Sequence, residues 1–392
     1  MRKGWEYKKL GEVCEVVTGT TPKTNIPEYW GKGHYWVTPA ELNDTTVYID
    51  KTERQITDEA LSKTKLRLLP VGTVLLSSRA PIGKVAIANA EMYCNQGFKN
   101  CICSEAIYNK YLFYFLRLKK DYLNSLGRGA TFKEISKSIV ESIKIPLPPQ
   151  STQLAIVSEL DKINELIRLK KEQLKDFDNL AQSLFYEMFG DPVENEKGWE
   201  VKKLGDCFSY IKNGANIKQT KDVDGFPITR IETLAGGIFN RDRMGYAGIY
   251  DLSKYSAYVL ESRDLLMSHI NSKTYIGRTV EYKRNNDETI IHGMNLLRLK
   301  AIHDIIDSTF FVYYTKSGDF KSKIARIRKD AVNQSSFAIS DLKRLNIPLP
   351  PLSLQRLFAQ RIEQIEREKS EVQKSIQDLE TLLASRMQYW FE

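Results

Sequence analysis

Two stretches of the chain repeat apolar residues every seven positions, with mostly Glu, Lys, Gln and Asp between them. Such heptads are typical of helices that pair in a coiled coil. In the first stretch the two core positions are Ile156, Ile163, Lys170, Phe177 and Leu184, and Leu160, Ile167, Leu174, Ala181 and Met188. In the second stretch they are Phe358, Ile365, Val372, Leu379 and Arg386, and Ile362, Lys369, Ile376, Leu383 and Trp390. A single amphipathic helix packed on a globular core is the alternative, but so long and narrow a stripe favours pairing.

The remainder of the chain is also repeated. Residues 4–12 (GWEYKKLGE) recur as 198–206 (GWEVKKLGD), and 145–149 (IPLPP) recur as 347–351. A glutamine follows each proline-rich hinge, at Gln153 and Gln355. Proline does not fit inside a helix, so each long helix is expected to begin just after its hinge. The repeat therefore predicts two equivalent modules, each followed by a long helix.

The two modules match best at their ends, while residues 15–130 and 209–330 diverge. Short β-type runs occur in both middles, and a helical segment closes each of them. The expected strands are 72–76, 84–88, 255–260 and 278–282, and the expected helical segments are 108–126 and 308–328. The predicted fold is α+β, with two mixed α/β modules separated by two long antiparallel coiled-coil helices in a pseudo-two-fold internal repeat. The expected divisions are 1–150, 151–190, 191–351 and 352–392.

Composition restricts the class of protein. The chain has 392 residues, 42% of them hydrophobic and 27% charged, and no apolar run reaches the roughly 20 residues of a membrane span. Its N-terminus does not read as a signal peptide, so we expect a cytoplasmic protein without a membrane partner. The five cysteines are scattered and are expected to be reduced. A net charge of +9 favours a polyanionic partner, most simply nucleic acid.

No catalytic motif stands out in the sequence. A phosphate-cradling G-x-x-x-x-G-K-[ST] motif and a G-x-G-x-x-G motif are both absent, and the four histidines lack metal-ligand spacing. We therefore expect no cofactor or metal in this chain. Two alternatives stay open: a metal-dependent nuclease using Asp191, Glu200 and Lys202, and a coiled-coil scaffold that does not bind DNA.

Both divergent middles contain polar and basic loops. Arg, Lys, Asn and Gln can bond base edges, and Lys, Ser and Thr can hold phosphates. The candidate DNA contacts of the first module are Thr20, Thr21, Lys23, Trp36, Thr38, Ser78, Arg79, Lys84, Asn95, Gln96, Lys99, Arg128 and Thr131. Those of the second are Asn213, Asn216, Lys218, Arg230, His269, Asn271, Lys273, Arg278, Asn333, Gln334 and Ser335. Residues 82–84 (IGK) and 276–278 (IGR) look equivalent. Each residue alone could belong to an ordinary hydrophilic turn, but the whole set favours DNA contact.

The helices would separate the two modules. The heptads cover about 33 residues, or about 50 Å at about 1.5 Å per residue. A turn of B-DNA is about 34–36 Å long. Two modules on such a rod could meet one duplex at two separated places, so the helix pair is expected to act as a ruler.

The opening motif, the hinge, the helix after it and the repetition of all three resemble the specificity subunit of type I restriction-modification enzymes. Residues 20–22 (TTP), 29–31 (YWG) and 36–39 (WVTP) resemble one class of target-recognition domain in that family. The resemblance implies that each module reads one half of an asymmetric, bipartite site in double-stranded DNA. It also implies that the helices set the gap and dock two modification subunits.

The same resemblance assigns the chemistry to other chains. The modification subunits would hold S-adenosylmethionine and methylate adenine. Restriction subunits, where present, would add DNA cleavage that uses ATP and Mg²⁺. This chain would then be a non-catalytic DNA-recognition subunit.

Overall fold

The structure is a computed structural model that describes residues 5–79, 81–129, 133–222, 224–332 and 334–392. By its internal contacts the chain divides into two compact units. The first unit is Met1–Lys171 with Lys374–Glu392, and the second is Glu172–Gln373. Each unit therefore combines one module with part of both long helices. The division of the sequence into four consecutive domains stays a prediction.

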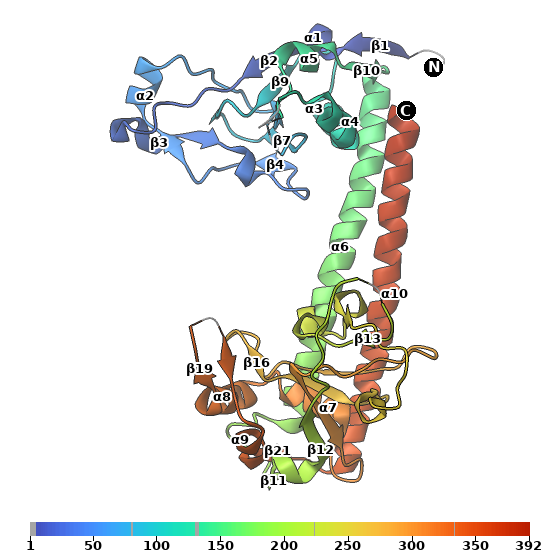
Figure 1. Ribbon diagram of the computed structural model, residues 1–392. Coiled ribbons are helices and arrows are strands. Elements are labelled where there is room, and N and C mark those ends of the chain that lie inside the picture. The colour runs from blue at the N-terminus through green and yellow to red at the C-terminus, as the bar shows by residue number, and fades with distance from the viewer. Residues whose placement is uncertain (1–4, 80, 130–132, 223, 333) are drawn as a thin grey trace. The chain divides into compact units, whose positions relative to one another are not determined.

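The long helices are α6 (Gln150–Phe189) and α10 (Leu352–Phe391), with 40 residues each. They are longer than the span of the heptads and begin directly after the prolines of each hinge. In the first unit, Lys171 of α6 pairs with Glu380 of α10 at 2.7 Å, and Glu159 pairs with Arg386. Residue numbers thus rise along one helix as they fall along the other, so the helices are antiparallel there (Figure 1).

The second unit repeats this antiparallel pairing. The Lys369 ammonium lies 2.7 Å from Asp178, and the Arg361 guanidinium lies 4.0 Å from the Met188 sulfur. Lys369 also pairs with Glu366 at 3.1 Å. Lys369 and Arg386, which interrupt the heptads of α10, each form an ion pair with an acidic residue of α6, and this neutralises their charge.

The apolar seam predicted from the heptads is confirmed. Most of its members are buried, including Ile156, Leu160, Ile163, Ile167, Ala181, Phe358, Ile362, Ile365, Val372 and Ile376. At the helix ends further aromatic residues pack on the modules. Phe391 lies against Tyr111 in the first unit, and Phe185 lies against Phe310 in the second. Hydrophobic burial of this stripe, rather than helix propensity alone, stabilises the long helices.

The central sheets of the two modules share four strands in the same order, and β4 is an additional fifth strand in the first module. In the first module the order is β2-β9-β6-β7-β4, and in the second it is β12-β18-β15-β17. The first set comprises β2 (Cys14–Thr18), β4 (Tyr48–Ile49), β6 (Val74–Leu76), β7 (Val85–Ala88) and β9 (Lys99–Cys103). The second comprises β12 (Phe208–Asn213), β15 (Leu265–Ser268), β17 (Thr279–Glu281) and β18 (Leu296–Ala301). The middles therefore keep a common framework even where their sequences no longer match.

The matched ends of each module pair with one another. Strand β1 (Glu6–Lys9) is antiparallel to β10 (Lys144–Leu147), and β11 (Glu200–Lys203) is antiparallel to β21 (Asn346–Leu349). The short helices beside them are α1 (Leu10–Val13) and α5 (Lys137–Ser142) in the first module, and η3 (Leu204–Cys207) and α9 (Ile339–Arg344) in the second. Each opening motif is thus held against its own hinge, which explains why the two recur together.

The glutamine after each hinge has the same function in both modules. Gln153 is buried; its Oε1 accepts from the amide of Tyr108 at 2.8 Å, and its Nε2 donates to the carbonyl of Pro148 at 3.0 Å. Gln355 is also buried and bonds the amide of Asp307 and the carbonyl of Pro350 in the same way. These amides precede helices α3 (Asn109–Leu118) and α7 (Ser308–Tyr314). The glutamine therefore joins the hinge to the start of the module's closing helices.

The predicted helical segments are confirmed, each as two consecutive helices. Helix α3 is followed by α4 (Lys120–Leu126), and α7 is followed by α8 (Gly318–Ile327). The predicted strands at 72–76, 84–88 and 278–282 correspond to β6, β7 and β17. The prediction for 255–260 was wrong, because a 3-10 turn, η6 (Ser256–Tyr258), lies there. The amide of Tyr258 bonds the carbonyl of Tyr255 at 2.8 Å, so the run turns at its start, and only an isolated bridge from Val259 to Ile291 follows.

The modules differ most in the elements added around the central sheet. The first module inserts β3 (Trp30–Val37), β5 (Gln55–Ile56) and β8 (Tyr93–Cys94), with η1 (Pro27–Tyr29), η2 (Pro39–Glu41) and α2 (Asp58–Lys63). The second has β13 (Pro227–Ile228), β14 (Gly245–Tyr246), β16 (Ile270–Asn271), β19 (Lys329–Asp330) and β20 (Ser335–Ser336), with η4 (Ile231–Gly237) and η5 (Arg241–Arg243). The five cysteines are free thiols, as their spacing predicts.

Candidate nucleic-acid interface

In the first module the predicted loops meet around the turn that follows β8. The Thr21 hydroxyl donates to the side-chain carbonyl of Gln96, and the amide of Asn95 donates to the carbonyl of Val37 at 3.2 Å. These bonds join loops that are far apart in the sequence into one polar surface. Its exposed side chains include Thr20, Lys23 and Gln96.

A network of charges adjoins this surface. Lys99 is buried, and its ammonium lies 3.0 Å from Glu134 and 3.3 Å from the Ser78 hydroxyl. The Arg79 Nε donates to the other oxygen of Glu134 at 2.9 Å, while the Arg79 side chain stays 48% exposed. Burial acts to raise the pKa of Glu134, but the hydrogen bonds from Lys99 and Arg79 outweigh it and hold that pKa below its usual range. The charged Glu134 thus restrains an arginine that faces solvent.

The neighbouring main chain explains how Glu134 reaches this position. The amide of Arg128 donates to the carbonyl of Glu134 at 3.0 Å, and the amide of Glu134 returns a bond to Arg128 at 2.9 Å. The Arg128 side chain is exposed. Thr131, which was predicted in the same loop, lies outside the described residues.

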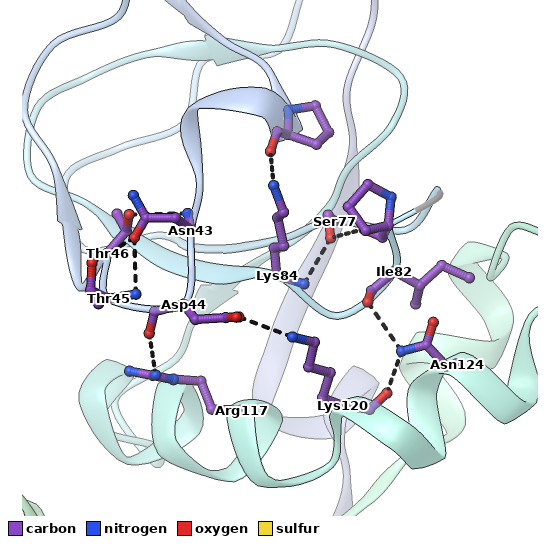
Figure 2. A network of polar contacts seen from close by, with 12 residues as sticks. Asn43, Asp44, Thr45, Thr46, Ser77, Ile82, Lys84, Arg117, Lys120 and Asn124 are labelled. Carbon is purple, nitrogen blue, oxygen red and sulfur yellow. Dashed lines mark hydrogen bonds and ion pairs between the residues drawn. The ribbon is translucent and has the colours of Figure 1, made fainter. Parts of the chain in front are cut away.

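Figure 2 shows Lys84 at the turn between β6 and β7. Its ammonium donates to the carbonyl of Pro39 at 3.0 Å, and its amide donates to the Ser77 hydroxyl at 2.8 Å (Figure 2). Thr38 caps η2, with its hydroxyl 3.1 Å from Glu41. Lys84 and Thr38 are partly buried, so both residues shape the surface while exposing only part of their side chains.

In the second module one loop carries three exposed predicted residues, Asn213, Asn216 and Lys218. The loop is fixed through Ala215, whose amide donates to the carbonyl of His292 at 2.8 Å. Arg230 lies on a neighbouring segment, with its Nε 3.5 Å from Glu232. The loop therefore presents amide and ammonium groups beside a partly buried arginine.

A small sheet in the order β16-β20-β19 contains the predicted residues Asn271 and Ser335, and Lys273 and Gln334 lie close to its strands in the sequence. Asn271 pairs with Ser335 in this sheet, and its side-chain amide donates to the Ser268 hydroxyl at 3.0 Å. Lys273 is exposed and pairs with Asp330 at 3.0 Å. Gln334 is exposed, and Asn333 lies outside the described residues.

His269 lies beneath this sheet. It is buried, and burial lowers its pKa to about 4, so the imidazole is neutral near pH 7. Its ring packs edge-on against Phe337 at 6.3 Å between centroids. A buried neutral imidazole in this position supports the sheet and offers no charge to a phosphate.

The predicted equivalence of 82–84 and 276–278 is confirmed by geometry. The amide of Gly83 bonds the carbonyl of Ser77 at 3.0 Å, and the amide of Gly277 bonds the carbonyl of Ser268 at 2.7 Å. Both glycines have positive φ, +87° and +81°, where other residues are strained. Lys84 and Arg278 follow them, so the two modules place a cation at the same turn.

Five predicted contacts are buried and held by neighbours within the protein: Trp36, Ser78, Lys99, His269 and Ser335. Their motifs are polar or aromatic, but the fold uses these side chains to position loops. Trp36, for example, donates from its indole nitrogen to the carbonyl of Thr20 at 3.2 Å. Because these five side chains are buried, we leave them out of the contacts proposed below, and their contact with DNA stays a prediction.

Sequence reasoning missed two residues on this surface. Glu134 organises Arg79 and Lys99, although it is 55 positions from the former. Arg54 lies 3.9 Å from the centre of the Trp30 ring and 5.2 Å from that of Trp36. The sequence shows the motifs that contain Trp30 and Trp36, but no pattern around Arg54 indicates that it packs against these rings.

The residues of the nuclease alternative are engaged separately. Asp191 accepts from the amide of Val193 at 2.9 Å, and Glu200 lies 3.5 Å from Lys202. Among the described residues, no group of three or more His, Cys, Asp or Glu side chains is placed to hold a metal ion. The helices that the structure describes include none long and apolar enough to cross a membrane.

Comparison with known sequences gives one family. Residues 2–176 and 196–381 both match the family model described as the type I restriction modification DNA specificity domain. The chain is 30% identical to the type I restriction enzyme MjaIX specificity subunit of Methanocaldococcus jannaschii, over 91% of this chain and 85% of that protein. It is 21% identical to the EcoKI specificity subunit of Escherichia coli, over 95% of this chain and 84% of that protein.

Solved structures agree with this at the level of the fold. A chain from a type I restriction-modification system aligns with a TM-score of 0.65 and 21% identity, covering 99% of this chain and 97% of that one. The S subunit of a type I system from M. genitalium aligns with a TM-score of 0.52 and 15% identity, covering 99% of this chain and 96% of that one. The fold class predicted from the repeat is therefore confirmed.

Proposed function

Because this chain belongs to the type I restriction modification DNA specificity family, we propose that its two modules read the two halves of an asymmetric DNA site. The observation that carries the proposal is the double match: both modules belong to the family, yet they present different side chains on the same framework. Two identical modules related by a two-fold axis would read a palindrome. Two different modules read two different half-sites.

The proposed contacts are the predicted residues that the structure leaves at least partly exposed. In the first module they are Thr20, Thr21, Lys23, Thr38, Arg79, Lys84, Asn95, Gln96 and Arg128. In the second they are Asn213, Asn216, Lys218, Arg230, Asn271, Lys273, Arg278 and Gln334. Arginine and the amides can recognise base edges, while lysine and the hydroxyls hold phosphates. Phosphate contacts should make affinity fall as salt rises.

Among these contacts Arg79 is the best placed to read a base. Its Nε is already bonded to Glu134, and Glu134 is held in turn by Lys99. The arginine is therefore restrained before DNA arrives, and less side-chain entropy is lost on binding. An arginine that forms paired bonds to guanine is the commonest specific contact in the major groove. We assign Arg79 to a guanine in the half-site of the first module.

The family also supports a function for the helices. At about 1.5 Å per residue, a 40-residue helix is about 60 Å long. We propose that α6 and α10 set the unread gap between the half-sites and dock two modification subunits. Those subunits would supply S-adenosylmethionine and methylate adenine, and restriction subunits would supply ATP- and Mg²⁺-dependent cleavage. This chain would contribute recognition without catalysis, in the cytoplasm where the DNA target lies.

Selection from a pool of random duplexes tests this function. The full-length chain, with its modification subunits, is used to capture duplexes, and the captured pool is sequenced. The proposal expects two short, different half-sites separated by a gap of fixed length and variable sequence. Capture without any shared motif would favour the scaffold alternative. Cleavage by the chain alone with Mg²⁺, lost in Glu200→Ala, would favour the nuclease.

A further inference from the structure

The equivalent cations Lys84 and Arg278 point into different surroundings. Each donates to a main-chain carbonyl of the segment beside its turn: Lys84 to Pro39 at 3.0 Å, and Arg278 to Leu234 at 3.2 Å. The two side chains therefore occupy matching positions in the two modules.

In the first module an acidic residue, Asp44, lies near Lys84. The Asp44 carboxylate is 2.9 Å from the Lys120 ammonium, and the main-chain carbonyl of Asp44 accepts a hydrogen bond from the Arg117 guanidinium (Figure 2). The bond from Lys120 lowers the pKa of Asp44, and the charges of Arg117 and Lys84 add to the effect. The Asp44 carboxylate is thus ion-paired with Lys120 and lies within the electrostatic influence of Arg117 and Lys84, so the site contains an anion of its own.

In the second module the corresponding place is a cavity of about 370 Å³. Its floor is apolar, with Ile276, Phe320 and Ile324. Its cations are Lys273, Arg278, Lys316, Lys321 and Arg328, and no acidic residue lines it among those described. The segment that supplies the carbonyl for Arg278 ends in Gly237, where the first module continues to Asp44. The second module therefore keeps the cations and lacks the internal carboxylate.

Nearby acids compensate only part of this charge. Asp330 pairs with Lys273 at 3.0 Å and with Arg328 at 3.2 Å. In the described part of the chain, Arg278, Lys316 and Lys321 form no ion pair within 4.0 Å, although the charges of Glu366 and Asp178 act on Lys316 and oppose the lowering of its pKa by burial. Like charges gathered at one cavity repel each other, so an anion from outside would relieve that repulsion.

We propose that this cavity binds one phosphate group of the DNA backbone, a step that rests on the function proposed above. Arg278 is poorly placed to read a base, because its Nη1 is bonded to Leu234 and its guanidinium lies 4.4 Å from the centre of the Tyr275 ring. Lysines hold phosphates as point charges without sequence preference. The cavity is therefore a site of sequence-independent anchoring in the second module, with Asp44 as its internal substitute in the first.

The salt dependence of DNA binding tests the proposal. The full-length chain, the Lys316→Gln/Lys321→Gln variant and a Lys343→Gln control are titrated with random-sequence duplex between 50 and 200 mM salt. Lys343 is exposed and lies beside Gly205, away from the cavity. Each phosphate contact contributes about 0.9 to the slope of log K against log salt. Because the cavity would hold one phosphate, we expect the double variant to lose at most about 0.9 of slope, equally on unrelated duplexes, and the control to keep the wild-type slope.

Other outcomes separate the alternatives. An unchanged salt slope in the double variant overturns the proposal. A changed half-site in duplex selection also overturns it, because the cavity would then recognise a base instead of a phosphate. Inorganic phosphate is added in a parallel arm at fixed ionic strength, with hydrogen exchange of residues 277–279 as the readout. If phosphate protected these amides while the salt slope of DNA binding stayed unchanged in the double variant, the cavity would bind a small phosphate ligand rather than DNA. That result would overturn the proposal. Absence of any DNA binding by the wild-type chain would instead refute the proposed function itself. The single variant Lys321→Gln changes only an exposed side chain and is therefore expected to fold normally. Its DNA binding should show a smaller salt slope, as in the double variant.

Discussion

Replacing Gln153 with alanine should loosen the junction between the hinge and α3. The side chain is 0% exposed; its Oε1 accepts from the Tyr108 amide at 2.8 Å, and its Nε2 donates to the carbonyls of Ala106 and Pro148, both at 3.0 Å. Alanine removes all three hydrogen bonds. At about 1 kcal/mol net for each bond, the local free energy of opening falls by about 3 kcal/mol, and buried groups left without partners add to the loss.

Hydrogen exchange at single amides measures this directly. Because each 1.4 kcal/mol is tenfold, the Tyr108 amide should exchange on the order of 100 times faster in Gln153→Ala. Gln355→Ala should do the same to the Asp307 amide, which Gln355 bonds at 2.9 Å, and leave Tyr108 unchanged. Gln360→Ala, on an exposed position of α10, is the control. A global melting curve is less suitable, because a chain of two units need not unfold in one step.

The pair of variants Gln153→Ala and Gln355→Ala also defines the results that would refute this reasoning. If the Tyr108 amide exchanged at the wild-type rate in Gln153→Ala, the glutamine would not hold the hinge, and its recurrence in both repeats would need another explanation. Equal acceleration of both amides by either substitution would contradict the assignment of each glutamine to its own module.

Three further predictions concern base reading, pH and spacing. Arg79→Ala should alter one position of the first module's half-site in duplex selection, with a loss of about 1–3 kcal/mol of discrimination there; a change in both half-sites would contradict its assignment. His269 is neutral when folded, with a pKa lowered from 6.5 to about 4, so the unfolded state binds more protons between these values. The urea midpoint of the second unit should therefore fall as pH drops from about 6.5 toward 4, and His269→Asn should reduce that dependence but not abolish it, because burial also lowers the pKa of His292 to about 3. Inserting seven residues after Leu174 and seven after Gln373 should widen the unread gap by about 3 base pairs, since it adds about 10 Å of helix and DNA rises about 3.4 Å per base pair; altered half-sites with an unchanged gap would refute the ruler.

The parts of the fold that follow a period or a repeat could be predicted from the sequence. The heptads identify the buried seam, because a seven-residue pattern leaves little choice of which face is covered. The duplicated hinge and opening motif predict two equivalent modules, and β1–β10 and β11–β21 pair in the same register. The run at 255–260 misled because a short apolar segment looks the same in a strand and in a turn, and here the turn residues 256–258 are not buried.

The candidate site was predicted only in part, for a different physical reason. Residue type shows that Lys99 can bond a phosphate, but it does not show that Glu134 and Ser78 enclose its ammonium. Burial depends on contacts between distant segments, and no local motif records them. The cationic cavity was missed for the same reason, since Lys273 and Lys321 meet only after α8 packs beside the turn at Gly277.

The central claim is that two different modules read two different halves of one DNA site. Methylome sequencing of cells that express this chain with its modification subunits tests it most directly. The account predicts adenine methylation at a single asymmetric motif, with two unlike half-sites and a gap of constant length. Methylation at a palindrome or at one continuous motif would contradict it.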